Sequence, residues 1–315
     1  MRMADAEQGG AEPILVVDDV TKRYGKFTAL EHVSFGVKKG THLLILGPNG
    51  AGKTTMIKCI LNLASFSGHI RVDGLDSKKD STEVKKIIGY VPQNYAFYEN
   101  LSVQEQAKMS SRLKGVNAIT QVQEKLERVD LWRVKGRKIR ALSDGMRQRL
   151  GIALALIGDP PILILDEPTS NIDLRGQLEF QDLLLKLLQE GKTMITSTHL
   201  TGLGELASEV LVLDKGKQIA HGEPSALLKR VNVADTLYLR VDNSHAHDIS
   251  ALIQDLVGSE VIVKGNWLTA SLMSADKMKV LKSLIDSGIR VDDLLIEPTS
   301  IESEYLKLID GGEST

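Results

Sequence analysis

A strand-like segment, a glycine-rich turn and a helix-like segment follow one another between residues 42 and 63. This order restricts the fold more than any other feature of the sequence. Residues 42–46 are apolar and of β type, residues 47–52 form the turn, and residues 53–63 are expected as a helix. Inward-pointing N–H groups of such a turn surround phosphates, and the positive end of the helix faces them. The residues expected to line these phosphates are Gly47, Pro48, Asn49, Gly50, Ala51, Gly52, Lys53, Thr54 and Thr55.

Two side chains at the start of this helix are expected to have separate tasks. Lys53 is placed to reach the β- and γ-phosphates of a nucleotide, and the hydroxyl of Thr54 is placed to bind Mg²⁺. A chance glycine turn before a helix is the alternative, but it does not account for the complete pattern of Gly, four residues, Gly, Lys, Thr. The segment therefore predicts an α/β fold that binds ATP or a similar nucleotide with Mg²⁺.

A second apolar segment, residues 162–165, ends in two adjacent carboxylates, Asp166 and Glu167. Successive side chains of a strand point to opposite faces, so the two acids are expected to have different roles. Asp166 suits the ligand shell of Mg²⁺, and Glu167 can act as general base toward an attacking water. His199 follows the next predicted strand, residues 193–197, and is expected to contact the γ-phosphate.

One segment distinguishes this chain from other NTPases and consists of Leu142, Ser143, Asp144, Gly145 and Met146. It resembles the signature motif of ABC ATPases, and the other motifs of that family appear in the same order. Tyr24 resembles the aromatic residue that stacks on adenine. Gln93 resembles the Q-loop glutamine that contacts Mg²⁺ and the catalytic water. Residues 170–173 lie where the family has its D-loop, and His199 resembles its switch histidine.

The resemblance implies a P-loop NTPase domain with a mixed sheet and a helical subdomain. It also implies a head-to-tail dimer with a second copy of the chain, or with a paralogous ATPase, around two ATP molecules and their Mg²⁺. Each nucleotide would contact the phosphate loop of one copy and Ser143 and Gly145 of the other, because N–H groups that open a helix suit a γ-phosphate. The family usually has Gly at Asp144 and Gln at Met146. We expect Asp144 to face solvent or the helix N-terminus, where an anion is favourable.

Residues 143–150 and 298–302 resemble the ATPases of ABC-2-type exporters. This resemblance implies an ATP-binding subunit that powers transport by separate integral membrane permease subunits. Such a subunit is cytoplasmic and lies peripherally on the inner face of the cell membrane. Three aromatic residues, Tyr95, Phe97 and Tyr98, have two interpretations. Either they line a groove for the permease, or they pack inside the helical subdomain.

Two alternatives remain open at this point. One is a soluble ABC ATPase that acts on ribosomes or DNA. Ribosome-acting members usually hold two nucleotide domains and chromosome-type members carry long coiled coils, and this sequence has neither feature. The other is the ATPase of the copper transporter that matures nitrous oxide reductase, which the region after residue 230 resembles in length and layout. That family often has an acid in place of Gln93.

Composition narrows the classes of partner. The formal net charge of -2 offers no electrostatic reason to bind nucleic acid or an anionic membrane surface, so no nucleic acid is expected. No segment approaches the ~18 uninterrupted apolar residues of a membrane-spanning helix. The single cysteine, Cys59, rules out an internal disulfide and is expected to be a buried, inert thiol in a reducing cytosol.

Three parts of the chain are predicted from its patterns. Residues 1–12 are expected as a disordered leader, residues 13–230 as the nucleotide-binding domain, and residues 231–315 as a small α+β accessory domain. The accessory domain has the order β-α-β-β-α-β of a ferredoxin-like split motif, followed by a helix at residues 300–309. Within the larger domain, residues 102–131 are predicted as one long helix with Ser102 as its cap.

Overall fold

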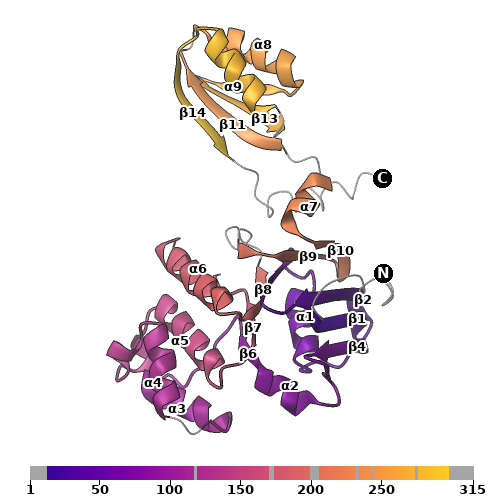
Figure 1. Cartoon of the computed structure of the whole chain (residues 1–315), viewed down its shortest axis with the longest axis vertical. Coiled ribbons are helices and arrows are strands. Elements are labelled where there is room, and N and C mark those ends of the chain that lie inside the picture. The colour runs from indigo at the N-terminus through magenta and orange to yellow at the C-terminus, as the bar shows by residue number, and fades with distance from the viewer. Residues whose placement is uncertain are drawn as a thin grey trace. The chain divides into compact units, whose positions relative to one another are not determined.

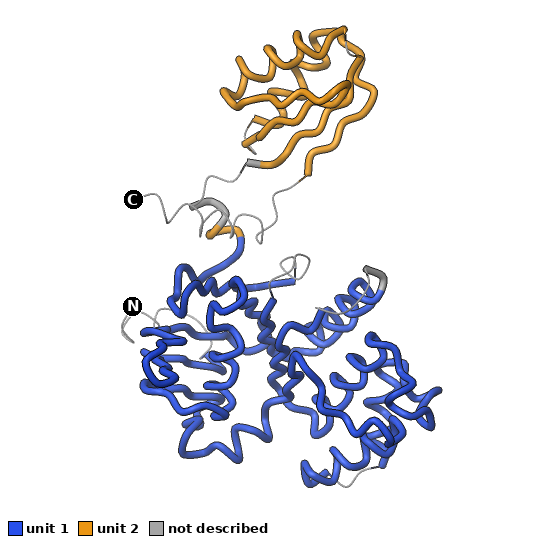
Figure 2. Tube along the Cα trace, turned by 180° about the vertical axis from the view of Figure 1, so that it is seen from behind, with its two compact units in different colours: residues 1–224 blue, residues 225–315 orange. Residues whose placement is uncertain are grey.

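The computed structural model describes residues 13–116, 119–169, 174–198, 206–230, 234–242, 244–273 and 276–297. The chain divides into two compact units, Met1–Pro224 and Ser225–Thr315, which Figure 2 shows in different colours. Several predicted features lie outside the described residues. They are the leader at 1–12, the D-loop at 170–173, His199, the exporter-like stretch at 298–302 and the closing helix at 300–309.

A six-stranded mixed sheet forms the centre of the first unit (Figure 1). Its order is β10-β9-β3-β8-β7-β6, in which β10 is antiparallel to β9 and the other neighbours are parallel. The strands are β3 (His42–Leu46), β6 (Ile88–Val91), β7 (Ile162–Asp166), β8 (Thr193–Thr198), β9 (Glu209–Asp214) and β10 (Lys217–Gly222). Every residue of β3, β7 and β8 is buried, as expected for parallel strands covered on both faces. The predicted mixed sheet is therefore confirmed.

A second, antiparallel sheet packs with helix α1 (Lys53–Ile60) into the main hydrophobic core. Its order is β2-β1-β4-β5. The strands are β1 (Pro13–Tyr24), β2 (Phe27–Lys38), β4 (Ser67–Val72) and β5 (Leu75–Asp76), and helix α2 (Ser81–Ile87) follows them. Cys59 lies on α1 with no exposed surface, so the predicted burial of its thiol is confirmed, and burial raises the pKa of that thiol to about 11.

The helical part of the first unit, which contains α3, α4 and α5, differs from one prediction. Residues 102–131 form two helices, α3 (Val103–Leu113) and α4 (Ile119–Arg128), instead of one. Gly115 has a φ of 71°, a left-handed conformation that cannot continue a right-handed helix. The predicted start is confirmed, because Ser102 and Glu105 form a capping box. Two further α-helices of this unit are α5 (Asp144–Leu156) and α6 (Leu174–Gln189). The short α7 (Pro224–Arg230) begins at the last residue of this unit and continues in the second.

The second unit has the predicted order β-α-β-β-α-β. Its elements are β11 (Ala234–Val241), α8 (Ala246–Val257), β12 (Val261–Lys264), β13 (Trp267–Met273), α9 (Lys277–Asp286) and β14 (Val291–Glu297). The sheet order is β12-β13-β11-β14, and every neighbouring pair is antiparallel. Both helices lie on the same face of this sheet (Figure 1). Within the described part of the chain, no helix combines the length and the apolar character needed to cross a bilayer.

A buried histidine opens the central strand of the first unit. Nδ1 of His42 is 3.1 Å from the carbonyl oxygen of Leu206, and its Nε2 is 2.7 Å from the hydroxyl of Thr196. A neutral ring satisfies both contacts, since Nδ1–H donates to the carbonyl and Nε2 accepts from the hydroxyl. Burial lowers the pKa of His42 to about 4. The histidine is therefore uncharged in the folded chain at neutral pH.

This histidine predicts a pH-dependent stability. An unfolded chain protonates histidine near pH 6.5, whereas folded His42 does so only near pH 4. Between these values the unfolded state binds the extra proton, so acidification lowers the free energy of unfolding by about 3 kcal/mol in total. Urea unfolding at pH 7.5, 5.5 and 4.5 should show this loss in the natural chain and a shallower dependence in His42→Asn. Equal pH dependence of the two proteins would contradict the assignment.

Candidate functional site

The glycine-rich turn between β3 and α1 requires its glycines for steric reasons. A Cβ atom on Gly47 would lie 2.6 Å from the carbonyl oxygen of Leu213 and 2.7 Å from the Cβ of Ala51. Gly52 has a φ of 106°, and its Cβ would lie 2.8 Å from the carbonyl oxygen of Ala29. No other residue fits these two positions without moving backbone. The turn is thus wedged between β9 and β2, with its N–H groups at the start of α1.

Lys53 places a buried positive charge inside this turn. Its side chain is only 4% exposed. Its Nζ donates to the carbonyl oxygens of Gly47 at 2.6 Å and of Pro48 at 3.2 Å. The same ammonium lies 3.3 Å from Oε1 of Glu167. A buried cation held by these oxygens is matched to the negative charge of a phosphate chain.

Asp166 is buried at the end of β7 and accepts two hydrogen bonds. The Thr54 hydroxyl donates to Oδ1 of Asp166 at 3.1 Å, and the Ser197 hydroxyl donates to the same oxygen at 2.6 Å. Ser197 Oγ also accepts the backbone N–H of Glu167 at 3.0 Å. Sequence reasoning missed Ser197 as a site residue. The strand register pairs Asp166 with Ser197, and only the order of strands in the sheet reveals this pairing.

Glu167 follows Asp166 but has a different set of partners, in line with the expected division of roles. Besides Lys53, its Oε2 accepts the side-chain N–H of Gln93 at 3.1 Å. The Glu167 side chain is 8% exposed. Its φ of 48° is a left-handed conformation, of a kind that concentrates at active sites. The fold therefore joins the predicted residues Lys53, Thr54, Gln93, Asp166 and Glu167 in one cluster. Lys53, Asp166 and Glu167 are buried in it, Thr54 is partly buried, and Gln93 approaches from the exposed side.

The cluster fits Mg²⁺ held together with a phosphate. The hydroxyl of Thr54 and the carboxylate of Asp166 offer two oxygen ligands side by side. No group of three or more His, Cys, Asp or Glu side chains suitable for a metal occurs among the described residues. Mg²⁺ needs only one or two carboxylates when phosphates complete its coordination, so these residues suit a nucleotide-bound cation.

The signature-like segment opens α5, a helix of the helical part. Ser143 is its N-cap, and the Ser143 hydroxyl accepts the backbone N–H of Met146 at 3.3 Å. Asp144 is exposed in the first turn, as expected for an anion at a helix N-terminus. Gly145 is partly buried. Arg147 pairs with both carboxylate oxygens of Glu99, at 2.8 and 3.2 Å.

The aromatic residues have different environments. Tyr24 closes β1 with 48% of its side chain exposed, and the ammonium of Lys22 lies 4.4 Å from its ring centre. Tyr95 and Phe97 stack with ring centres 4.9 Å apart, and Tyr95 packs on Gly151 of α5 so closely that a Cβ there would clash. Tyr98 is 61% exposed. The interpretation that these aromatic residues pack in the helical part therefore holds for Tyr95 and Phe97, whereas Tyr98 lies on the surface.

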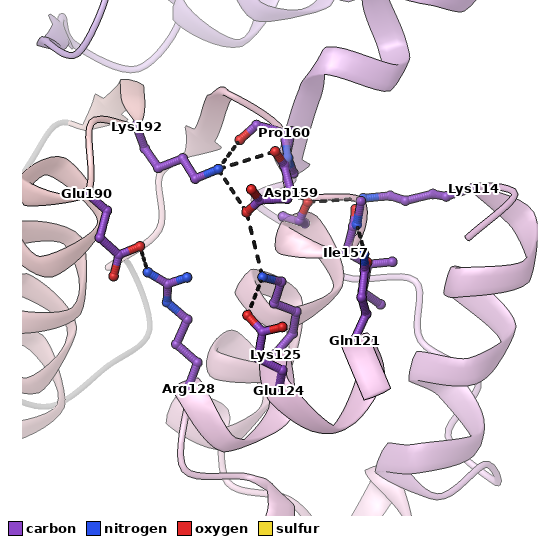
Figure 3. Close-up of polar contacts among 12 residues, drawn as sticks. Lys114, Gln121, Glu124, Lys125, Arg128, Ile157, Asp159, Pro160, Glu190 and Lys192 are labelled. Atoms are coloured by element: carbon purple, nitrogen blue, oxygen red, sulfur yellow. Dashed lines mark hydrogen bonds and ion pairs between the residues drawn. The ribbon is translucent and has the colours of Figure 1, made fainter. Parts of the chain in front are cut away.

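Lysine side chains hold the loop that joins α5 to the acidic strand β7 (Figure 3). Lys192 Nζ donates to Oδ1 of Asp159 and to the carbonyl oxygen of Pro160, both at 2.9 Å. Lys125, from α4, lies 3.6 Å from the same Asp159 carboxylate. Lys114 donates to three carbonyl oxygens at the end of α5, those of Leu154, Ala155 and Ile157. These lysine contacts thus fix the loop through which α5, with the signature-like segment, continues into the acidic strand β7.

Comparison with known proteins identifies relatives of this chain. The family model described as "ABC transporter" matches residues 30–170. The chain is 31% identical over 307 residues to the daunorubicin resistance ATP-binding protein DrrA3 of Streptomyces coeruleorubidus, which covers 95% of this chain and 96% of the relative. It is 35% identical over 311 residues to the Nod factor export ATP-binding protein I of Ralstonia nicotianae, with 95% and 94% covered.

A solved structure resembles the first unit. It is the dimeric, post-hydrolysis state of the ATP-binding cassette MJ0796 bound to ADP and phosphate. The TM-score is 0.61 at 29% sequence identity, and the match covers 66% of this chain and 98% of that structure. The likeness therefore covers nearly all of that cassette and about two thirds of this chain.

Proposed function

Because this chain belongs to the ABC transporter family as an ATP-binding subunit of the exporter type, we propose that it hydrolyses ATP in a head-to-tail dimer and thereby drives a separate membrane permease. The observation that carries the proposal is the cluster of Lys53, Thr54, Gln93, Asp166 and Glu167 at the end of the central sheet. The relatives matched over nearly the whole chain are transport and resistance ATP-binding proteins, and the soluble alternative is not favoured.

The phosphate loop and Lys53 bind the nucleotide. The N–H groups of the loop and the Lys53 ammonium surround the phosphates, and the exposed ring of Tyr24 offers a surface on which adenine stacks. Thr54 and Asp166 hold Mg²⁺, which neutralises charge on the phosphates when it is bound. Ser197 keeps the Asp166 carboxylate oriented through its hydroxyl.

Glu167 is the general base. Gln93 and Lys53 both contact its carboxylate, so its two oxygens are held by fixed partners before water arrives. A base that is positioned in advance accepts the proton of the attacking water without reorganising the site. Gln93 contributes by positioning this carboxylate. His199, outside the described residues, is assigned to the γ-phosphate on the family resemblance.

A second copy, or a paralogous ATPase, completes each site. Ser143 and Gly145 open α5, so N–H groups and a hydroxyl are available to the γ-phosphate of a nucleotide held by the partner. The Asp144 carboxylate is exposed at the helix start and has to point away from this phosphate, because two anions repel. ATP then joins the two copies, and hydrolysis removes the contact that holds them together.

The permease is proposed to contact the joint between the sheet core and the helical part. A cavity of about 330 Å³ lies there and includes Leu63, Tyr90 and Lys114 in its lining. Leu63 is 58% exposed, although it is apolar. A permease segment in this cavity would contact both the sheet core and the helical part, so a shift of one relative to the other would move it. We also propose that the chain works in an export system at the inner face of the membrane. The name of the Nod factor export relative supports the export part of this proposal.

Co-purification tests this function. An affinity-tagged chain, solubilised from native membranes in mild detergent, should bring down a polytopic membrane protein identified by mass spectrometry. Leu63→Glu should lower the yield of that protein about tenfold or more, because it buries a charge at the interface. Ile119→Glu is the matched control at an apolar site that is 68% exposed, and its yield should be unchanged. Recovery with ribosomes or DNA and no membrane protein would overturn the proposal.

A further inference from the structure

The sheet of the second unit has one covered and one open face. The covered face packs on α8 and α9, and its buried residues include Leu237, Leu239, Leu268, Ala270 and Leu272. Side chains alternate along each strand, so the residues between these point to the other face. On that face Ile262 is 53% exposed, Leu295 is 56% exposed and Trp267 is 37% exposed. The open face therefore displays apolar side chains that the described residues of this unit leave exposed.

The strand register arranges this open face in rows across the sheet. The middle row runs from one edge to the other in the order Ile262, Thr269, Tyr238, Leu295. The neighbouring row runs in the order Lys264, Trp267, Arg240, Asp293. In the second row the guanidinium of Arg240 lies 5.6 Å from the centre of the Trp267 ring and 3.9 Å from the Asp293 carboxylate.

Each row matches a copy of itself that runs in the opposite direction, because apolar residues then face apolar residues and opposite charges face each other. A two-fold axis parallel to the strands brings two such faces together so that each edge strand faces the opposite edge strand of the other copy. Ile262 then faces the partner's Leu295, which pairs two apolar side chains. Lys264 faces the partner's Asp293, which pairs opposite charges, and Trp267 faces the partner's Arg240. No like charges oppose each other in either row.

We propose that the open sheet face of the second unit binds the same face of a second copy of this chain. This inference rests on the proposed function, in which ATP brings two copies together, and it assigns the second unit a role in that dimer. Two sheets packed in this way lie about 10 Å apart, with the side chains of the two rows interdigitated.

The size of the face explains when this contact forms. Four strands about 4.8 Å apart and about 20 Å long present on the order of 400 Å² per copy. A standard stable interface buries about 800 Å² per partner. The contact is therefore too small to hold two free chains together. It forms when the nucleotide-binding units are already joined, because joining raises the effective concentration of the second units to the millimolar range.

Cysteine cross-linking tests the geometry in the full chain. Thr269 lies beside the proposed axis, so Thr269→Cys should react with its counterpart through a short bismaleimide. Native Cys59 is buried and does not compete. The experiment uses Glu167→Gln chains with ATP and Mg²⁺, and size-exclusion chromatography of the same samples reports the nucleotide dimer separately. Met278→Cys is the control, since Met278 is 73% exposed on α9, on the covered side of the sheet.

Charge pairs test the register. Ile262→Glu should lower the cross-linked fraction about fivefold or more, because the change occurs twice in a two-fold interface. Leu295→Lys should act likewise. The double variant should restore cross-linking, because each Glu then faces a Lys of the other copy. Within one copy these positions lie on opposite edge strands, about 14 Å apart, so the rescue arises only between copies.

The outcomes separate this inference from the proposed function. ATP-dependent cross-linking at position 269 but not at 278, with rescue in the double variant, supports the face-to-face contact. A nucleotide dimer without cross-linking at 269, equal cross-linking at 278, or no rescue overturns the contact and leaves the proposed function intact. Absence of the nucleotide dimer itself overturns both, and size-exclusion chromatography detects that case directly.

Discussion

Glu167→Gln is expected to lower ATP turnover at least ~100-fold while an ATP-bound dimer accumulates, because a glutamine cannot accept the proton of the attacking water. The substitution keeps the shape of the side chain, and an amide oxygen can still accept the Gln93 N–H that contacts Oε2. Lys53 retains its contacts with the carbonyl oxygens of Gly47 and Pro48, so the loop stays in place. Binding is thus preserved while the chemical step fails.

Two measurements on the same protein check this result. Steady-state phosphate release reports turnover, and size-exclusion chromatography with ATP and Mg²⁺ reports the dimer. Glu83→Gln is the matched control, because Glu83 is an exposed residue of α2 that forms an ion pair with Lys86 on the same helix. Its turnover should equal that of the natural chain. Unchanged turnover in Glu167→Gln would refute the assignment of the base.

Gly47→Ala is expected to reduce ATP affinity at least ~100-fold, since a displaced loop loses several hydrogen bonds to the phosphates and each bond to a charged group contributes about 1.5–3 kcal/mol. The new Cβ would lie 2.6 Å from the carbonyl oxygen of Leu213, a backbone atom held in β9 next to β3. It would also meet the Cβ of Ala51 within the turn. Relief of both contacts requires the loop to move, and Lys53 loses the carbonyl positions that now orient its ammonium.

Gly50→Ala serves as the matched control in the same turn. Nothing lies within 4 Å of the position that its Cβ would take, although its φ is 85°. The expected cost is therefore only that of a left-handed backbone, about 1–2 kcal/mol. Equilibrium titration with a fluorescent ATP analogue measures both variants, and circular dichroism confirms that each is folded. Equal affinities of Gly47→Ala and the natural chain would show that the loop adapts and that the steric argument is wrong.

Several parts of the site were predictable because their chemistry is contiguous in the sequence. The loop at 47–54 follows a strand and opens a helix, and Asp166 and Glu167 end an apolar strand. These local patterns need no knowledge of distant contacts. The same holds for the Ser102 capping box, which involves residues of one helical turn. The prediction of a single helix at 102–131 was wrong because its periodicity continues across Gly115, where the backbone turns left-handed.

Long-range pairs were not predictable in this way. Ser197 bonds to Asp166 because β8 lies beside β7, and strand order depends on how the whole sheet assembles. Lys192, from the loop between α6 and β8, and Lys125, from α4, both contact Asp159, so these contacts with the α5–β7 loop have no local pattern either. Likewise, the rows on the open face of the second unit follow from strand register across the whole sheet.

The sequence by itself determined which chemical groups this protein has and the local shapes that carry them: a phosphate loop, an acidic strand end and a capped helix with Ser143 at its start. Backbone propensities and short-range hydrogen bonds act within a few residues, so a linear pattern is enough to specify them. Only the tertiary structure decided which groups meet. Gln93 and Lys53 reach the same Glu167 carboxylate because the packing of sheets and helices closes distances that the chain leaves open.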